Sequence, residues 1–382
     1  MKLVPHMDST FMLSGLMAVS QAINLNWYPP SKTDLNNLTA ALTGDGVYGF
    51  IFNTSETPDQ VYGLYNWCNM PHVRSTEYVK ASDEYELDQV AGMLINGMWE
   101  TTDPIPLLVQ AEGIDSLEPQ YSCDVGKSLT DAIKSSSNAD WQQHLNLTAD
   151  LFAALDAISG VPEDDSGFHV SFDHYFDNLS ARQCHAKPLP CKLVDVEGHN
   201  YNNSATTDDC VDQALADAVY RMGQWEYSQI YRDANASLSS SVTSYGVWIA
   251  ELSAHLQDAM AGKEEAPIYM HNVAHDGSTS RVLSILQADS MVWPGMGSEI
   301  VFELYKKREG GELAGNETLG ENRFYVRVLF SGQTLRSSNP GLGLMDMLPV
   351  ETLLAYFDGL VGESASKVKG KCNGSIPVSE GY

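Results

Sequence analysis

Apolar residues in the middle third of the chain recur at helical spacing. The pattern is clear over Trp141–Ile158 and over Thr206–Tyr227, which opens with a Thr/Asp cap. It returns over Tyr245–Gly262, where Gly262 is a typical helix end, after a Ser-rich stretch at Ser237–Ser244 that we interpret as a spacer. The middle of the chain therefore predicts a mainly helical region.

The last third alternates between strand and helix patterns. Apolar residues occupy every second position in two segments, and Ile300, Phe302 and Leu304 share one face of the first. The expected strands are Pro267–Ala274, Ser298–Lys307 and Arg323–Gly332, and the expected helices are Thr279–Gln287 and Leu348–Leu360. This order predicts an α/β sheet, which the helical middle would cover as an insertion.

The first part of the chain has few periodic runs and is rich in Asn, Pro, Tyr and Gly. We expect an extended, loop-rich arm there, with one candidate strand at Val47–Phe52. The predicted organisation is a signal peptide at 1–22, the arm at 23–89, an α/β core from 90–140 and 245–366, a mainly helical cap insertion at 141–244, and a tail at 367–382.

Composition and charge exclude several classes of partner. Of the 382 residues, 43% are hydrophobic and 19% charged, which is typical of a globular protein. The net charge of −28 would repel nucleic acid and anionic lipid, so neither is an expected partner. No apolar run reaches the roughly 18 residues that a membrane span needs.

Secretion is indicated by the N-terminus and by glycosylation sequons. The apolar run Phe11–Ala22 ends in Ser20-Gln21-Ala22, with small residues where a signal peptidase cuts. A buried first helix is the alternative, but eight Asn-x-Ser/Thr sequons make a cytosolic protein improbable. The candidate glycosylation sites are Asn37, Asn53, Asn146, Asn178, Asn202, Asn235, Asn316 and Asn373.

The cysteines agree with an extracellular location. They are even in number and form no C-x-x-C pair, so disulfides are favoured over zinc or redox chemistry. Sequence does not choose their connectivity, and it does not give the oligomeric state. The disulfide candidates are Cys68, Cys123, Cys184, Cys191, Cys210 and Cys372.

Candidate chemistry sits where the strand Pro267–Ala274 gives way to the next helix. His275 and Asp276 occupy this junction, and ligands of open α/β sheets collect beside such helix N-termini. Free backbone N–H groups there suit an anion such as phosphate, and a carboxyl group could protonate a leaving alcohol. On the dipeptide alone, an ordinary helix cap and a structural histidine are the better interpretations. A metal site of His271, His275 and Asp276 ranks lowest, because strand rise separates the two histidines.

Longer segments of the sequence favour the phosphate interpretation of this junction. "YMHNVAHDGSTSRVLSIL", "WPGMGSEIVFELY" and "FYVRVLFSGQTLR", in that order, resemble the C-terminal half of histidine acid phosphatases, especially the fungal secreted branch. "NWCNMPHVRSTEY", "NLSARQCHAKPLPC" and "YGVWIAELSAHL" extend the resemblance over most of the chain. It implies a three-layer, mostly parallel sheet flanked by helices, with a helical cap.

The same resemblance implies a function. The chain would be a secreted acid phosphatase that hydrolyses small phosphate monoesters through a phosphohistidine, without a cofactor or metal. His275 would bind the phosphate and Asp276 would be the proton donor.

One motif of that family is absent. None of the ten histidines follows an arginine, so the Arg-His-x-x-Arg-x-Pro segment that carries the nucleophile is missing. The break falls near Asp88–Val90, and one core strand is expected to be missing with it. Either the sequence lacks an exon of an active phosphatase, or the chain is a catalytically inactive secreted glycoprotein. We favour the first, because losing a central strand costs more than the roughly 5–15 kcal/mol that holds a domain together.

Overall fold

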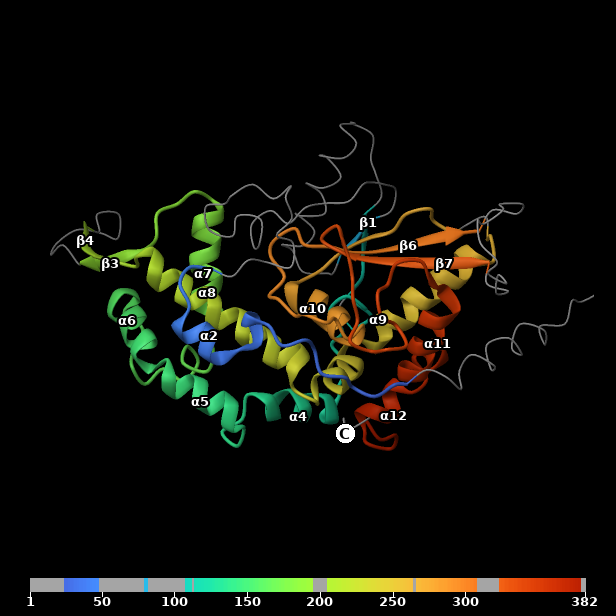
Figure 1. Cartoon of the computed structure of the whole chain (residues 1–382), viewed down its shortest axis with the longest axis horizontal. Coiled ribbons are helices and arrows are strands. Elements are labelled where there is room, and N and C mark those ends of the chain that lie inside the picture. Colours follow the sequence, from blue (N-terminus) through green and yellow to red (C-terminus); the bar gives the residue numbers. More distant parts are fainter. Residues whose placement is uncertain are drawn as a thin grey trace, which may run out of the picture.

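Helices and short strands alternate through the computed structural model, which describes residues 24–47, 79–81, 107–111, 113–194, 205–263, 266–307 and 323–378 (Figure 1). The helices are η2 (Asp34–Asn36), α2 (Leu38–Thr43), α4 (Asp124–Ile133), α5 (Ala139–Leu147), α6 (Ala149–Ser159), α7 (Asp173–Cys184), α8 (Gln213–Ser228), the π-helix η4 (Gln229–Asp233), α9 (Ser237–Met260), α10 (Asp276–Ile285), α11 (Val350–Val361), η5 (Glu363–Ala365) and α12 (Val368–Cys372). The strands are β1 (Val79–Ala81), β2 (Leu107–Val109), β3 (Cys191–Val194), β4 (Ala205–Cys210), β5 (His271–Val273), β6 (Ile300–Lys306), β7 (Phe324–Phe330), β8 (Gln333–Thr334) and β9 (Leu348–Pro349).

The described strands form three separate sheets. β1 lies between β2 and β5 and runs parallel to both, with Val79 opposite Leu107 and His271. β6 and β7 pair antiparallel over their whole length, and β8 and β9 pair with β7. A two-stranded ribbon of β3 and β4 stands apart. The mixture of helix and strand confirms the coarse α/β class, while the described strands do not form one mostly parallel sheet.

The loss of a core strand stays a prediction. The break near Asp88–Val90 and its flanks lie outside the described residues, as do the signal peptide and the candidate strand Val47–Phe52. Within the described sheet, the place between β2 and β5 is filled by β1, which precedes that break in the sequence.

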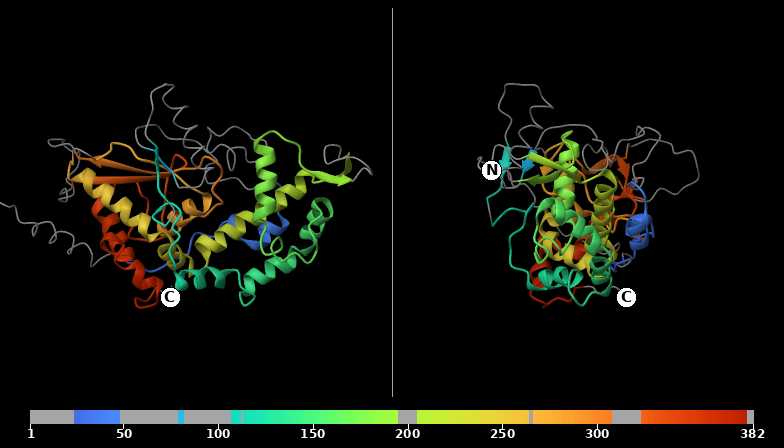
Figure 2. Two further views of the ribbon diagram at one scale, coloured as in Figure 1. Left: turned by 180° about the vertical axis from the view of Figure 1, so that it is seen from behind. Right: turned by 90° about the vertical axis from the view of Figure 1, so that its left-hand side faces the viewer.

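Two hydrophobic clusters hold the protein together. The first surrounds α9, which packs against α4, α10 and α11, and it includes the inward faces of β6 and β7. The second lies among α5, α6, α7 and α8, and its largest buried side chain is Trp141. Figure 1 shows these helices at one end of the molecule and β6, β7 and α11 at the other, and the reverse view in Figure 2 agrees. The domain division predicted from sequence remains a proposal.

Three segments fold differently from their sequence patterns. Thr206–Cys210 is not helical but forms most of β4, which the disulfide Cys191–Cys210 fastens to β3. The helix expected over Trp141–Ile158 is broken at Thr148, whose hydroxyl donates to the His144 carbonyl and closes α5. Ser237–Ser244 is no spacer, since it forms the first two turns of α9.

Small side chains explain why a Ser-rich run can be a buried helix. Thr243 and Ser244 donate their hydroxyls to carbonyls one turn earlier, so these polar groups are satisfied inside the helix. Their small volume lets α4 approach closely, and Thr130 Oγ1 lies 2.7 Å from Ser240 Oγ. A Cβ added to Gly126 on α4 would lie 2.5 Å from Thr243 Oγ1.

Disulfides also fix the ends of this packing. Cys123, the N-cap of α4, is bonded to Cys372 at the end of α12, 249 residues away in the sequence. Cys184 is disulfide-bonded too, and Cys68 lies outside the described residues. Within the described part of the chain, no helix is both long and apolar enough to cross a membrane.

The contact between α4 and α9 predicts the effect of Gly126→Ala. At an open helical site this change would stabilise by about 1 kcal/mol. Here the new methyl group meets Thr243 and the Cys123 sulfur at 2.9 Å, so we expect a loss of about 1–3 kcal/mol in denaturant unfolding. Ser128→Ala, on the exposed side of α4, is the control and should change stability little. Adding Thr243→Ala should restore part of the loss, and stabilisation by Gly126→Ala alone would contradict the close approach.

Candidate functional site

The strand-to-helix junction predicted from sequence is present. β5 ends at Val273, and α10 begins at Asp276 with His275 as its N-cap. His275 has extended backbone angles and its side chain makes no cap hydrogen bond, while its carbonyl accepts from Thr279 N–H. The cap interpretation concerned Asp276, which is the first residue of α10 and not its N-cap.

Asp276 is held by three donors. Its Oδ2 accepts from the Tyr227 hydroxyl at 2.7 Å and from the Trp293 indole N–H at 2.5 Å. Its Oδ1 accepts from the Gly277 N–H at 2.6 Å. An indole and a backbone N–H can only donate, so each carboxyl oxygen already has one fixed donor. Because Oδ2 already accepts two donors, a proton carried by Asp276 would have to use the remaining position on Oδ1.

Aromatic rings fix these donors in place. The Trp293 ring lies between Tyr227 and Phe176, with centroid distances of 3.8 Å and 3.9 Å and nearly parallel planes. The backbone N–H of Trp293 donates to the side-chain oxygen of Gln224 on α8. Burial, followed by the negative charge of Asp276, raises the pKa of Tyr227 well above its usual range, so this phenol remains a donor at any ordinary pH. Sequence reasoning missed Tyr227 and Trp293, because they are remote in sequence from the junction.

A second carboxyl group belongs to the surroundings of Asp276. Asp177 on α7 is exposed, yet partial desolvation of its carboxyl group by its neighbours raises its pKa to about 6. The negative charges of Asp276 and Asp173 add to the rise, and His174 opposes it. Asp177 lies on α7, which belongs to the second hydrophobic cluster, whereas Asp276 lies on α10, which packs in the first. Each cluster therefore contributes one carboxyl group to the surroundings of the junction.

Metal binding by His271, His275 and Asp276 has no geometric support in the described residues. His271 opens β5, and its Nδ1 lies 2.7 Å from the Tyr269 hydroxyl, two residues away. Among the residues that the structure describes, no group of three His, Cys, Asp or Glu side chains is arranged to hold an ion.

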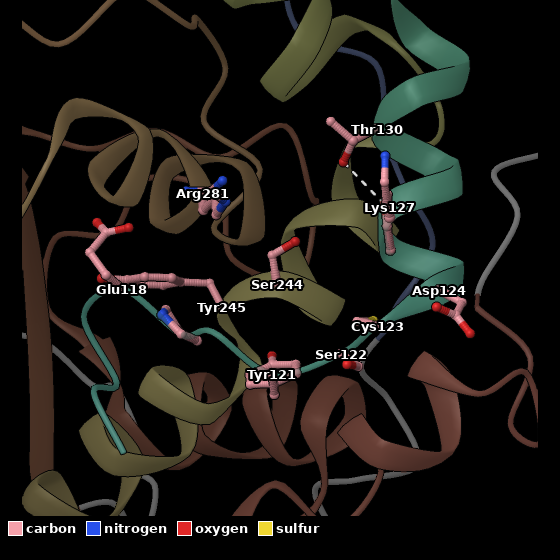
Figure 3. A pocket seen from close by; sticks show the side chains of 12 residues that line it. Glu118, Tyr121, Ser122, Cys123, Asp124, Lys127, Thr130, Ser244, Tyr245 and Arg281 are labelled. Atoms are coloured by element: carbon pink, nitrogen blue, oxygen red, sulfur yellow. Dashed lines mark hydrogen bonds between the residues drawn. The ribbon is translucent and has the colours of Figure 1, made fainter. Parts of the chain in front are cut away.

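A cavity lies on another side of α10. Its volume is about 400 Å³, and neither His275 nor Asp276 lines it (Figure 3). Arg281 of α10 joins it to the junction, because a Cβ on Gly277 would lie 3.3 Å from Arg281 Nη1 and 3.4 Å from the Tyr231 hydroxyl. Other walls of the cavity are formed by Glu118, Tyr121, Lys127, Ser244 and Tyr245.

Comparisons with known proteins find distant similarity to solved structures. No protein-family model matches the chain, and no curated protein matches it. Among solved structures, the chain is similar to a phytase from Klebsiella sp. ASR1, with a TM-score of 0.43 and 13% sequence identity. The match covers 89% of this chain and 94% of that chain. A similarity this distant carries no argument about the site.

The Asp177 environment predicts a pH effect. A carboxyl pKa raised from 3.8 to about 6 on folding means that the folded state holds the proton more tightly than the unfolded state. The contribution of Asp177 to stability is therefore full below pH 4 and lost as the pH rises to about 6. Asp177→Asn should remove this loss, measured as a smaller fall in unfolding free energy between pH 4 and pH 6.5.

The Asp276 charge can be tested in the same titration. Asp276→Asn should lower the pKa of Asp177 towards its ordinary value, followed by the side-chain carboxyl signal in NMR. An Asp177 pKa that does not move in this variant would show that the two carboxyl groups do not interact.

Proposed function

We propose that this chain is a secreted protein of the histidine acid phosphatase type that binds small phosphate monoesters at the β5–α10 junction. His275 binds the phosphate and Asp276 is the proton donor. The single observation that supports this most is the position of Asp276: it opens a helix directly after a parallel strand, with its carboxylate oriented by Tyr227 and Trp293.

The remaining features of that family belong to the same proposal. They are a three-layer, mostly parallel sheet, the cap insertion at 141–244 between core segments 90–140 and 245–366, and the resemblance to the fungal secreted branch. Exposure of the sequons supports secretion, since an acceptor asparagine must be reachable. The five acceptor asparagines in the described residues are all exposed: Asn37, Asn146, Asn178, Asn235 and Asn373. Disulfides also favour an oxidising compartment.

Hydrolysis requires a nucleophile that the 382 residues do not contain. In the complete enzyme, a histidine of the Arg-His-x-x-Arg-x-Pro segment would attack phosphorus while Asp276 protonates the leaving oxygen. Water would then cleave the phosphohistidine. The second candidate function, a phosphate-binding glycoprotein without catalysis, is favoured by one observation: no histidine of the chain follows an arginine.

We expect the 382-residue protein to bind inorganic phosphate without hydrolysing an aryl phosphate at acid pH. Binding of phosphate should be detected by calorimetric titration. Turnover would be measured as release of the phenol from the aryl phosphate. Binding should weaken in His275→Ala, because the imidazole contact is lost. Rapid hydrolysis by the unmodified chain would contradict the proposed need for the missing segment.

The transcript distinguishes the two candidate functions. Reads that cross Gln89–Val90 without interruption favour the non-catalytic protein, and an inserted segment that encodes Arg-His-x-x-Arg-x-Pro favours the enzyme. In a product with that segment, Asp276→Asn should lower turnover by about 100-fold or more, the usual scale of general acid catalysis, with little loss of phosphate binding. Unchanged turnover would remove Asp276 from the chemistry.

A further inference from the structure

Arg281 is a half-buried cation in an acidic protein. It lies on α10 and forms no ion pair or hydrogen bond with any residue in the described ranges. Two other arginines of the described chain have such partners: Arg327 is paired with Asp346 at 2.8 Å, and Arg232 donates to the Ala288 carbonyl at 2.7 Å. The N–H donors of the Arg281 guanidinium are therefore available to a ligand in the cavity that this side chain lines.

The surroundings of Arg281 place its charge in the cavity. Its Nη1 stands over the first turn of α10, close to the Cα of Gly277. Three tyrosines lie close enough to feel its charge. Burial raises the pKa of Tyr121 to about 12, and burial also raises the pKa of Tyr231 and Tyr245. The positive charge of Arg281 opposes the rise in all three. Figure 3 shows Arg281 beside Tyr245 and Glu118 along one wall, facing Lys127 and Thr130 of α4.

The other charged groups of the cavity limit what it can hold. Lys127 is engaged with Asp131 at 2.7 Å and is exposed, so it offers little further charge. The Glu118 carboxylate accepts the Ser278 hydroxyl and would repel a bare anion. Asp124, at the first turn of α4, adds negative charge on the far side. Carboxylates are, however, good acceptors for hydroxyl groups of a ligand.

We propose that Arg281 binds the anionic group of a hydroxyl-bearing phosphate monoester in this cavity, with the hydroxyls of its alcohol part directed to Glu118. A planar guanidinium matches two phosphate oxygens at once, and 400 Å³ is ample for a small ester. The inference deepens the proposed function and rests on it for the ligand class. It adds Arg281, a residue outside the His-Asp pair and outside the absent motif, to the groups that bind the ligand.

The test uses calorimetric titration of the 382-residue glycoprotein with glycerol 2-phosphate and with inorganic phosphate. We expect Arg281→Gln to weaken binding of the ester about ten- to a hundredfold, the scale of one lost charged hydrogen-bond pair. Arg336→Gln, at an exposed arginine, is the matched control and should bind as the wild type does. Arg281→Lys keeps the positive charge but lacks the paired N–H donors of the guanidinium, so it should bind the ester several-fold more weakly. This variant provides the measurement if Arg281→Gln does not fold.

The Glu118 contact has its own signature. The wild type should prefer glycerol 2-phosphate to inorganic phosphate, and Glu118→Gln should reduce this preference by strengthening binding of the bare anion. Equal affinities of the wild type for both probes would overturn the assignment of Glu118.

Failure of the inference is distinguishable from failure of the proposed function. If Arg281→Gln binds like the wild type while His275→Ala loses binding, Arg281 is excluded and the junction site stands. If Arg281→Gln loses binding while His275→Ala keeps it, the cavity is the site and the role of His275 is wrong. If the wild type binds neither probe, the inference is overturned.

Discussion

The carboxylate of Asp276 is the interaction on which the arrangement of the two hydrophobic clusters depends. Asp276 begins α10, whose later residues, Val282 to Leu286, are buried in the cluster around α9. Its partner Trp293 is buried in the other cluster, among the side chains of α7 and α8. One carboxylate that accepts from Tyr227 and Trp293 therefore ties the cores together at a point where apolar packing alone would leave a polar gap.

Sequence patterns predicted the last third of the chain well, because each element there has an unmixed periodicity. β6 and β7 lie within the predicted strands, and Ile300, Phe302 and Leu304 of β6 pack against the core. α10 begins at Asp276, two residues after the predicted strand end and three before the predicted helix start. Prediction failed where long-range contacts overrule local preference. A disulfide and a neighbouring strand hold Thr206–Cys210 extended, and close packing against Gly126 makes a buried helix of serines that read as a linker.

The candidate site was only half visible in the sequence. His275 and Asp276 could be found because the junction of strand and helix is a local pattern. Tyr227, Trp293 and Asp177 could not, because they come from elements 17 to 99 residues away and no spacing rule links them to the junction. The same holds for Arg281: its position six residues after His275 is plain in the sequence, but its lack of a partner is a property of the fold.

The overall negative charge of the protein opposes the binding of an anion. A surface with a net charge of −28 repels phosphate esters at long range, so affinity has to come from short-range contacts in a place sheltered from that field. In the two proposals, such contacts would come from His275 and the N-terminal amides of α10 at the junction and from Arg281 at the cavity. Raising the ionic strength would screen the surface repulsion more than these sheltered contacts. Association with an anionic ester should therefore change little or even strengthen with moderate salt, unlike that of a protein whose basic surface attracts its ligand.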